Sequence, residues 1–266
     1  MKNKGITLKN PKFRYSKADY FMDKKTNSIY KGIKSIKFLN ENVTNDLYTL
    51  RDNEYDTFID LLIELENISI NSRQLDILIK LDYFSEFGTR KKLLDTVEIY
   101  DKWYNKKQFK KDNLPLKEEL FKEFAEGETA KIFKNVNTYK LCKFLESNLD
   151  DTELSMIDII RAEQEFTGSV TYIDKNIDPM TLVILSVNTK YTPKLKVYSP
   201  ISGNSETIKI KKKIFRELPL HEYDIIIVDG VYEKNRKTMN DKGEWVEVED
   251  TEFWCDGYEL IDEVAR

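Results

Sequence analysis

Positive charge is concentrated near one end of this 266-residue chain. The first 40 residues hold ten Lys and one Arg against only Asp19 and Asp23, which leaves nine net positive charges. Residues 241–266 hold ten acidic residues against Lys242 and Arg266. Clustered basic side chains attract phosphate groups, so this asymmetry favours a basic end that binds nucleic acid. The alternative is an ordinary solvated, lysine-rich surface, and composition alone leaves both interpretations open.

Residues able to carry out catalysis are scarce. The one histidine, His221, is expected in a turn rather than as a general base. Asp224 and Asp229 flank the apolar run IIIV, where paired acids more often face solvent than bind a metal. Cys142 and Cys255 are too few and too far apart in sequence for a disulfide framework or a zinc site. We therefore expect no catalytic residue, no metal and no cofactor in this chain.

The composition favours a folded, intracellular protein. Apolar residues make up 40% of the chain and aromatic residues 12%, which is enough to build real cores. No apolar run approaches the roughly 20 residues that a membrane-spanning helix needs. The first residues contain no apolar signal segment, and two isolated cysteines fit a reducing compartment. The predicted location is therefore the cytoplasm, without membrane association.

Apolar spacing divides the chain into three predicted regions, 1–54, 55–165 and 166–266. The first is basic and irregular. The second is helical, with a helix at 72–84 that Asn71 or Ser72 can cap and further helical patterns at 116–125, 129–147 and 153–165. The third contains strand-like runs at 181–189, 193–200, 206–215 and 223–234. Short strands at this spacing predict a small barrel or sandwich after a boundary at Ala162–Thr167, so the predicted fold class is α+β.

Three stretches resemble a known protein family when they are taken in order. They are Gly5-Ile6, Pro11 and Ser16 followed by IYKGIKSIK (29–37); INSRQLDILIKLDYFSEFGTRKKLL (70–94); and EQEFTGSVTYID (163–174) with FWCDGYELI (253–261). Together they resemble the C-terminal part of the alpha subunit of bacterial DNA polymerase III, the C-family replicative polymerase. The resemblance implies a helical region with helix-hairpin-helix units, followed by an OB-like β-barrel.

The resemblance also implies that the hairpins bind duplex DNA. Helix-hairpin-helix units hold phosphates through backbone amides and basic side chains, without reading the base sequence. The side chains that it assigns to duplex contact are Lys34, Lys37, Asn40, Asn71, Arg73, Thr89, Arg90, Lys91 and Lys92, with Lys31 adding charge nearby. For the basic run 90–92, the alternative is a solvated helix start.

Two hairpin positions depart from the family pattern. In the family, glycines follow the Ile-Lys pair of the first hairpin and let the backbone approach phosphate closely. Here that place is taken by Phe38-Leu39-Asn40, and the second hairpin has Asp82 where the family often has glycine. We therefore expect side chains such as Lys37 and Asn40 to compensate for lost backbone contacts.

The predicted barrel offers a second nucleic-acid surface. OB-folds hold single strands by stacking bases on aromatic side chains within a basic groove. Strand alternation predicts one face with Lys194, Lys196 and Tyr198, and a neighbouring one with Lys209, Lys211 and Lys213. The assigned single-strand contacts are Tyr191, Lys194, Lys196, Tyr198, Lys211 and Lys213. The alternative is an exposed face whose lysines block edge pairing. Trp245 and Trp254 are expected in the core or in hairpin packing.

The resemblance finally predicts partners and the absence of activity. The family's polymerase palm uses three carboxylates to hold two Mg²⁺ ions, and no PDxD-like pattern occurs in this chain. Leu120-Phe121 in KEELFKEF (117–124) is a weak candidate for docking on the sliding clamp, with core packing as the better alternative. The predicted function is a non-catalytic, DNA-binding C-terminal module that works with DNA and with a catalytic polymerase chain if that chain is separately encoded. The alternative is a free-standing nucleic-acid-binding or protein-interaction adaptor.

Overall fold

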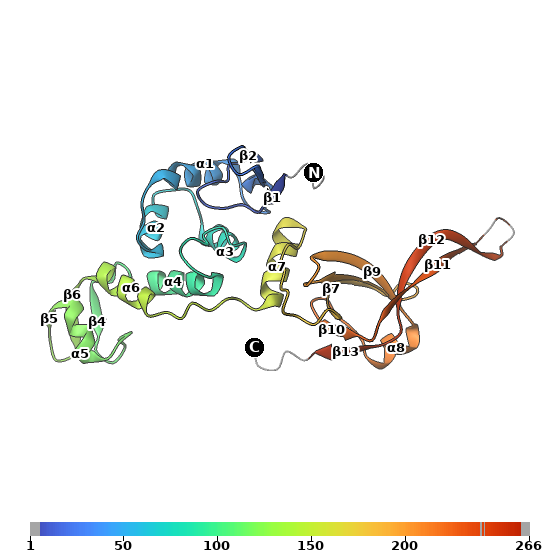
Figure 1. The fold of residues 1–266 in the computed structure, drawn as a ribbon. Helices are drawn as coiled ribbons and strands as arrows, with labels where there is room; N and C mark the ends of the chain where they lie inside the picture. The colour runs from blue at the N-terminus through green and yellow to red at the C-terminus, as the bar shows by residue number, and fades with distance from the viewer. Residues whose placement is uncertain (1–5, 240, 242, 262–266) are drawn as a thin grey trace. The chain divides into compact units, whose positions relative to one another are not determined.

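The computed structural model describes residues 6–239, 241 and 243–261 (Figure 1). The chain forms two compact units, Met1–Ser155 and Met156–Arg266. The predicted boundary at Ala162–Thr167 instead coincides with the end of helix α7 (Met156–Thr167), which belongs to the second unit. Among the described residues, no helix has the length and hydropathy needed to cross a membrane.

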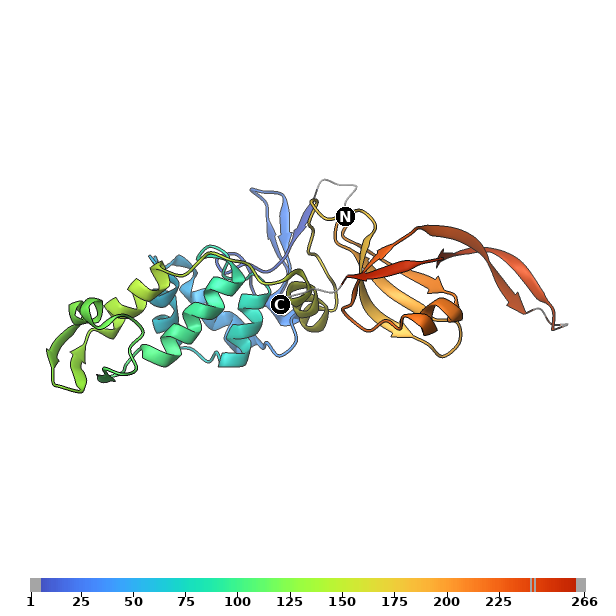
Figure 2. The same ribbon diagram turned by 90° about the horizontal axis from the view of Figure 1, so that it is seen from below.

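The first unit opens with a small sheet rather than irregular chain (Figure 2). Its strands are β1 (Thr7–Lys9), β2 (Phe21–Asp23) and β3 (Ser28–Tyr30), in the order β1-β3-β2. The short helices that follow are η2 (Ile33–Ser35), α1 (Glu41–Thr49) and η3 (Leu50–Asp52). The turn between η2 and α1 is the first hairpin, residues 36–40.

Three helices follow, and side-chain caps fix where two of them begin. They are α2 (Phe58–Leu65), α3 (Ser72–Lys80) and α4 (Arg90–Trp103). The Asn71 side-chain oxygen accepts from the Gln74 backbone amide, and the Gln74 side-chain oxygen accepts from the Asn71 backbone amide. The predicted cap of α3 is therefore confirmed as a complete capping box. Thr57 and Asp60 form the same arrangement at α2. The turn between α3 and α4, residues 81–88, is the second hairpin.

Aromatic rings from distant segments form the centre of this unit. Phe13, Phe58 and Phe84 are at most 1% exposed, and the Phe84 ring centroid lies 5.5 Å from each of the other two. The N-terminal segment that contains Lys12 and Phe13, called the lead-in chain below, is held against the second hairpin, because the Phe13 amide donates to the Tyr83 carbonyl at 2.9 Å. The basic N-terminal segment is therefore part of the hairpin fold.

The region after α4 agrees with its prediction only in part. Of the helices predicted at 116–125 and 129–147, the first is confirmed over 118–124 and the second over 138–147. A three-stranded sheet, in the order β4-β6-β5, accounts for the rest of this part. Its core is a stack of Phe109, Phe121 and Phe133, with ring centroids 5.1 and 5.2 Å apart along the series. The elements are β4 (Gln108–Lys110), α5 (Glu118–Phe121), η4 (Lys122–Phe124), β5 (Ala125–Glu128), β6 (Ile132–Val136) and α6 (Thr138–Ser147).

The second unit is a curled mixed sheet, consistent with the predicted OB-like barrel. After α7 its elements are β7 (Thr181–Asn188), β8 (Lys194–Ser199), β9 (Asn204–Ile210), α8 (Lys212–Glu217), β10 (Ile225–Val228), β11 (Val231–Met239), β12 (Trp245–Cys255) and β13 (Tyr258–Ile261). The strand order is β11-β12-β9-β8-β7-β10-β13, with β9 and β12 parallel. The run predicted as one strand at 206–215 is therefore divided between β9 and α8.

The sheet curls where two long strands are interrupted. β10 and β11 are separated only by Asp229 and Gly230, and β12 and β13 only by Asp256 and Gly257. A Cβ atom at Gly257 would lie 2.0 Å from the Asp229 carboxylate, so glycine is required for this close approach. Beyond the interruption, β11 and β12 continue as a long hairpin (Figure 2).

Candidate nucleic-acid interface

The first hairpin presents two neighbouring side chains to solvent. Ile36 and Leu39 are buried, whereas Lys37 is exposed and Phe38 is 51% exposed. Asn40 is predicted to contact DNA, and its side-chain oxygen caps α1 by accepting from the Val43 amide at 3.0 Å. The buried residues and the cap therefore fix the turn that carries Lys37 and Phe38.

Helix α3 adds a second cation beside this turn. The Arg73 guanidinium carbon lies 3.7 Å from the centroid of the Phe38 ring, within cation–π range. Next to it, the Gln74 side-chain amide donates to the Phe38 carbonyl at 3.0 Å. The structure thus brings together Lys37, Phe38 and Arg73 from two segments, and we call these three residues the hairpin-tip cluster. Asn71, also assigned to duplex contact, is exposed at the start of the same helix.

Lys34, in contrast, is partly neutralised by neighbouring acids. Its ammonium group lies 2.9 Å from the Glu41 carboxylate and 3.9 Å from that of Asp19. The hydrogen bond that Lys34 donates to the Glu41 carboxylate raises the pKa of Lys34 above its ordinary value, so the ammonium group stays charged but is already paired. Lys34 therefore offers less attraction to a phosphate than Lys37 does.

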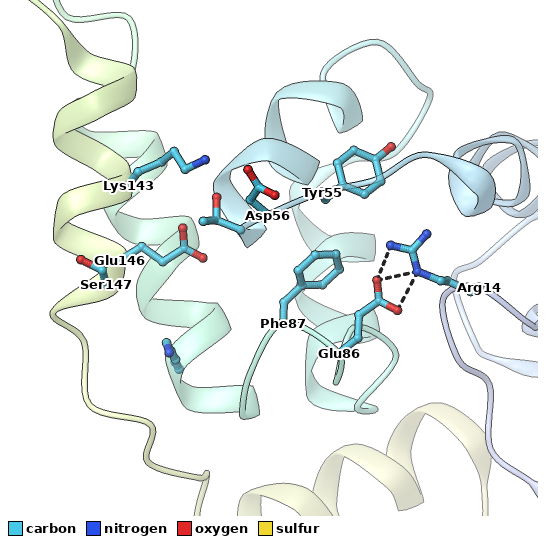
Figure 3. Close-up of a pocket in the computed structure, with 10 residues that line it drawn as sticks. Arg14, Tyr55, Asp56, Glu86, Phe87, Lys143, Glu146 and Ser147 are labelled. Carbon is cyan, nitrogen blue, oxygen red and sulfur yellow. Dashed lines mark hydrogen bonds and ion pairs between the residues drawn. The ribbon is translucent and has the colours of Figure 1, made fainter.

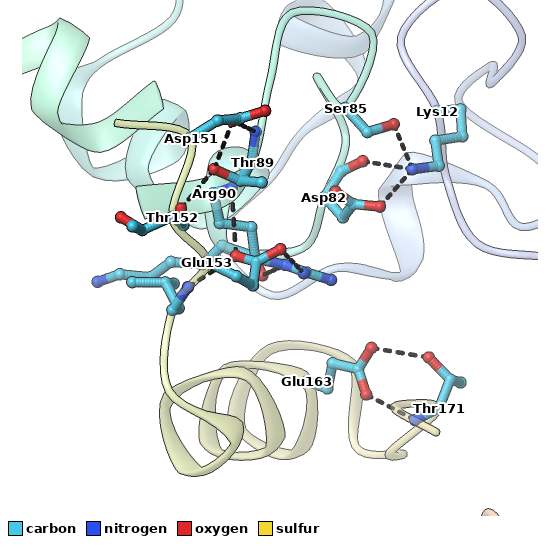
Figure 4. A network of polar contacts seen from close by, with 12 residues as sticks. Lys12, Asp82, Ser85, Thr89, Arg90, Asp151, Thr152, Glu153, Glu163 and Thr171 are labelled. Carbon is cyan, nitrogen blue, oxygen red and sulfur yellow. Dashed lines mark hydrogen bonds and ion pairs between the residues drawn. The ribbon is translucent and has the colours of Figure 1, made fainter. Parts of the chain in front are cut away.

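The second hairpin is tied to the lead-in chain rather than open. Lys12 donates to the Asp82 carbonyl at 2.8 Å and also contacts the Asp82 carboxylate and the Ser85 hydroxyl (Figure 4). Asp82 has a φ of +63°, so it adopts the left-handed conformation that glycine provides in the family. Because Lys12 binds both the carboxylate and the carbonyl of Asp82, this turn is joined to the N-terminal segment of the chain.

At the N-terminus of α4, the residues 89–91 that are predicted to contact phosphate are paired with acidic side chains. The Thr89 amide and hydroxyl donate to Asp151 at 3.1 and 2.9 Å, and Arg90 donates to Glu153 at 2.8 Å (Figure 4). The bonds from Thr89 hold the pKa of Asp151 below its usual range. Lys91 pairs with Asp95 one turn later. These predicted phosphate ligands thus already bind carboxylates of the same chain at a helix end that favours anions.

A pocket of about 420 Å³ lies beside these helices, and two of the charged side chains that line it, Arg14 and Glu86, pair with each other (Figure 3). Arg14 donates to Glu86 at 2.8 and 2.9 Å. Glu146 is 6% exposed, and its carboxylate accepts from the Phe58 amide at the start of α2 at 2.9 Å. Burial raises the pKa of this carboxyl group. Lys92, a predicted duplex contact, lines this pocket rather than extending from the surface with Lys91. We assign no ligand to this pocket.

The barrel face predicted to bind single strands is only partly exposed. Lys194 and Lys196 are exposed and alternate with the buried Leu195 and Val197, so the predicted strand periodicity of β8 is confirmed there. Tyr198, however, is 0% exposed, because Ile157 and Ile160 of α7 pack in the same cluster. The prediction that Tyr198 stacks on bases is therefore wrong.

Other residues predicted to bind single strands lie at separate places in the second unit. Lys211 is the residue before α8 and pairs with Asp256 at 2.7 Å, and Lys213 lies on α8 itself. The prediction that these two share a strand face with Lys209 is wrong, since β9 ends at Ile210. Tyr191 is 71% exposed between β7 and β8.

Sequence reasoning missed an aromatic and basic row beside Lys194. Trp254 stands opposite Lys209 in the β9–β12 ladder and opposite Tyr232 in the β11–β12 ladder, while Lys209 stands opposite Lys194. The ammonium groups of Lys209 and Lys234 lie 5.5 and 5.7 Å from the Trp254 ring. The signal was the spacing of Glu252 and Trp254, two residues apart in β12, which places Trp254 on the same outer face as Glu252 and opposite the buried Cys255.

Neither unit has a recognisable metal centre in the part of the chain that the structure describes. No three His, Cys, Asp or Glu side chains lie there in an arrangement that could hold a metal ion. Of the two predicted clamp-docking residues, Phe121 is 0% exposed and packs with Phe109 and Phe133. The core-packing alternative is therefore confirmed for Phe121, and Leu120 beside it is half-buried.

Comparison with known proteins agrees with the geometry of the first unit. No curated protein matches the chain. Residues 5–94, however, match the family model of the helix-hairpin-helix motif, a span that contains the first and second hairpins and the whole hairpin-tip cluster. The chain therefore carries a helix-hairpin-helix motif in this N-terminal part, and that motif supports nucleic-acid binding.

Proposed function

We propose that this protein is a non-catalytic DNA-binding module of the kind found at the C-terminus of bacterial replicative polymerase alpha subunits. The observation that carries this proposal is the helix-hairpin-helix motif with its exposed cluster of Lys37, Phe38 and Arg73. Two cations, Lys37 on the first hairpin and Arg73 on α3, suit phosphates of a duplex backbone, which position a protein without reading sequence. The positive charge of the first 40 residues adds a sequence-independent attraction.

The cluster differs from a glycine-rich hairpin in how it would bind. Side chains extend beyond the backbone at Lys37 and Phe38, so the backbone amides of this turn are not the first groups to meet DNA. We propose that the Lys37 ammonium group and the Arg73 guanidinium group replace amide contacts to phosphate. This role follows from their exposure and from the fixed turn that carries them.

Duplex affinity should fall when Lys37 and Arg73 are changed together to Ala. Each lost phosphate contact lowers the slope of log affinity against log salt by about one, so the double variant should lose about two from that slope. The measurement is a titration of labelled duplexes of different sequence at several salt concentrations. Affinity should fall to a similar extent for every sequence, because phosphate contacts carry no base information.

A matched control is Lys131→Ala with Lys134→Ala, which removes two exposed lysines from the β5–β6 hairpin. This control should retain the wild-type salt slope. An unchanged slope in the Lys37 and Arg73 variant, with its fold intact, would contradict the role of the hairpin-tip cluster.

The second unit is proposed to hold single-stranded DNA on its aromatic and basic row. Trp254 and Tyr232 offer ring faces, and Lys194, Lys209 and Lys234 surround them. Stacking on such rings with lysines beside them binds any base sequence. Glu252 accepts from Lys209 and from the Trp254 indole, and it orients both groups at the cost of one opposing charge.

The chain is proposed to lack polymerase activity of its own, with DNA and a separate catalytic chain as partners. Nucleotide transfer by the resembling family needs three carboxylates that hold two Mg²⁺ ions. Purified protein with primed template, Mg²⁺ and nucleotides is therefore expected to extend no primer, as measured on a denaturing gel. Template-dependent extension that co-purifies with the chain through every column would contradict this expectation. Adding a catalytic polymerase preparation in parallel confirms that the template is competent.

The alternative function is a protein-interaction adaptor with the same fold. The acidic residues on the β11–β12 hairpin, including Glu247, Glu249 and Asp250, favour this alternative for that part of the barrel. Capture of a partner that carries the polymerase palm separates the replicative module from the adaptor. Phe121 is buried, so the sliding clamp has no exposed pair at 120–121 to bind and is not proposed as a partner.

A further inference from the structure

Phe38 adopts a backbone conformation that its side chain disfavours. Its φ is +69°, in the left-handed region that bulky L-residues rarely occupy. Four of the other described non-glycine residues with positive φ are Asn or Asp, which tolerate that region, and the fifth is Tyr223. Tyr223 packs against the core of its unit, whereas half of the Phe38 side-chain surface is exposed. A strained backbone that presents an aromatic ring to solvent points to a role outside folding.

The surroundings hold this ring in one place. Gln74 donates to the Phe38 carbonyl at 3.0 Å, and the Leu39 amide donates to the Ile36 carbonyl at 3.3 Å. Arg73 lies over the ring at 3.7 Å, which fixes its orientation and leaves exposed surface elsewhere on the side chain. A ring that is already fixed loses little conformational entropy when a ligand stacks on it.

We infer that Phe38 stacks on an unpaired base at a junction between duplex and single-stranded DNA, an inference that rests on the proposed DNA-binding function. Within a continuous duplex both faces of every base are covered by its neighbours. An aromatic ring can reach a base face only where stacking is interrupted, as at a junction. Arg73 lies over the ring and Lys37 is its neighbour in sequence, so both cations are available to phosphates next to the stacked base. The cluster then recognises the structure of the DNA rather than its sequence.

The decisive variant is Phe38→Gly, which removes the ring and at the same time relieves the backbone strain. A structural role and a binding role then predict different results. If Phe38 stacks on a base, affinity for a primer–template junction should fall about tenfold, since one base stacked on an aromatic ring contributes roughly that much. The urea midpoint should equal or exceed that of the wild type. Affinity for a relaxed, covalently closed minicircle, which has no junction, should fall by a smaller factor, because only the contact between Arg73 and the ring is lost there.

Two further variants control for the loss of an exposed ring. Phe38→Tyr keeps an aromatic face and should retain junction binding. Tyr20→Ala removes a ring that is 62% exposed in the same basic segment and should leave junction binding unchanged. Wild-type junction affinity in Phe38→Gly, or an equal loss on junction and minicircle, would overturn the stacking inference while leaving duplex binding intact. Failure of the wild type to bind the minicircle at low salt would instead overturn the proposed function itself.

Discussion

Replacing Tyr198 by Ala is expected to lower the free energy of unfolding of the barrel unit by about 3–5 kcal/mol, as for other large buried aromatic residues. Tyr198 is 0% exposed and belongs to the cluster that joins β7, β8 and β10 to α7. Its hydroxyl group donates to the Tyr172 carbonyl, so truncation also leaves that carbonyl without this donor. Removing the side chain thus opens a cavity and also breaks a partly buried hydrogen bond.

The measurement for Tyr198 is urea unfolding combined with amide hydrogen exchange along β7 and β8. Tyr198→Phe is the matched control, because it keeps the ring and removes only the hydroxyl group, at a cost of about 1–3 kcal/mol. Burial raises the pKa of Tyr198 to about 12, from an ordinary value near 10. The unfolded chain therefore ionises first as pH rises, and stability falls between about pH 10 and about pH 12. That loss should be smaller in Tyr198→Phe. Equal stability of the Ala variant and the wild type would contradict the buried position.

The position of Tyr198 illustrates what strand periodicity can and cannot predict. Alternation along β8 correctly separated Lys194 and Lys196 from the buried Leu195 and Val197. It could not predict that α7, some 40 residues earlier in the chain, covers the end of that face. Which part of a sheet face a helix protects is decided by tertiary packing, and no local pattern in β8 records it.

The hairpins show a similar division between local and distant information. The cap at Asn71 and the apolar face of α3 are local, and the sequence predicted them correctly. The partners of Thr89 and Arg90 are not local, because Asp151 and Glu153 lie more than 60 positions away. A basic run at a helix start looks the same whether its partner is a phosphate or a carboxylate of the same chain.

Two hairpin residues that are not glycine have a backbone conformation that sequence alone left open. Phe38 and Asp82 keep the left-handed backbone that glycine would adopt, so the turns have the expected shape despite their side chains. Different hydrogen bonds stabilise the two turns. The Gln74 side chain donates to the Phe38 carbonyl, and Lys12 donates to the carbonyl and the carboxylate of Asp82. The left-handed shape of each turn thus depends on contacts from residues outside the turn itself, Gln74 and Lys12, which lie elsewhere in the matched span.

The sheet at 108–136 was missed for the same physical reason. β6 pairs with β4, which precedes it by more than 20 residues, and with β5 across a short turn. Phe133 is buried by Phe121 rather than by a helical neighbour three or four positions away. A short apolar pattern fits a helix or a strand equally well until its partner is known.

Phe84→Ala is expected to destabilise the hairpin unit by about 3–5 kcal/mol. The Phe84 side chain is 0% exposed, and its ring centroid lies 5.5 Å from those of Phe13 and Phe58 and 4.9 Å from that of Tyr83. Through these rings it joins the lead-in chain, α2 and the second hairpin. Its removal leaves a cavity that three separate segments would have to close.

Phe87→Ala offers a matched control for Phe84 in the same hairpin. Phe87 is half-buried, with its ring 5.6 Å from that of Phe58, so its truncation should cost less than that of Phe84. Urea unfolding of both variants gives the comparison, and a larger loss in the Phe87 variant would contradict the packing described here. Neither residue belongs to the hairpin-tip cluster. Both variants should therefore bind duplex DNA with wild-type affinity at urea concentrations where they remain folded. This comparison separates a loss of stability from a loss of the binding surface.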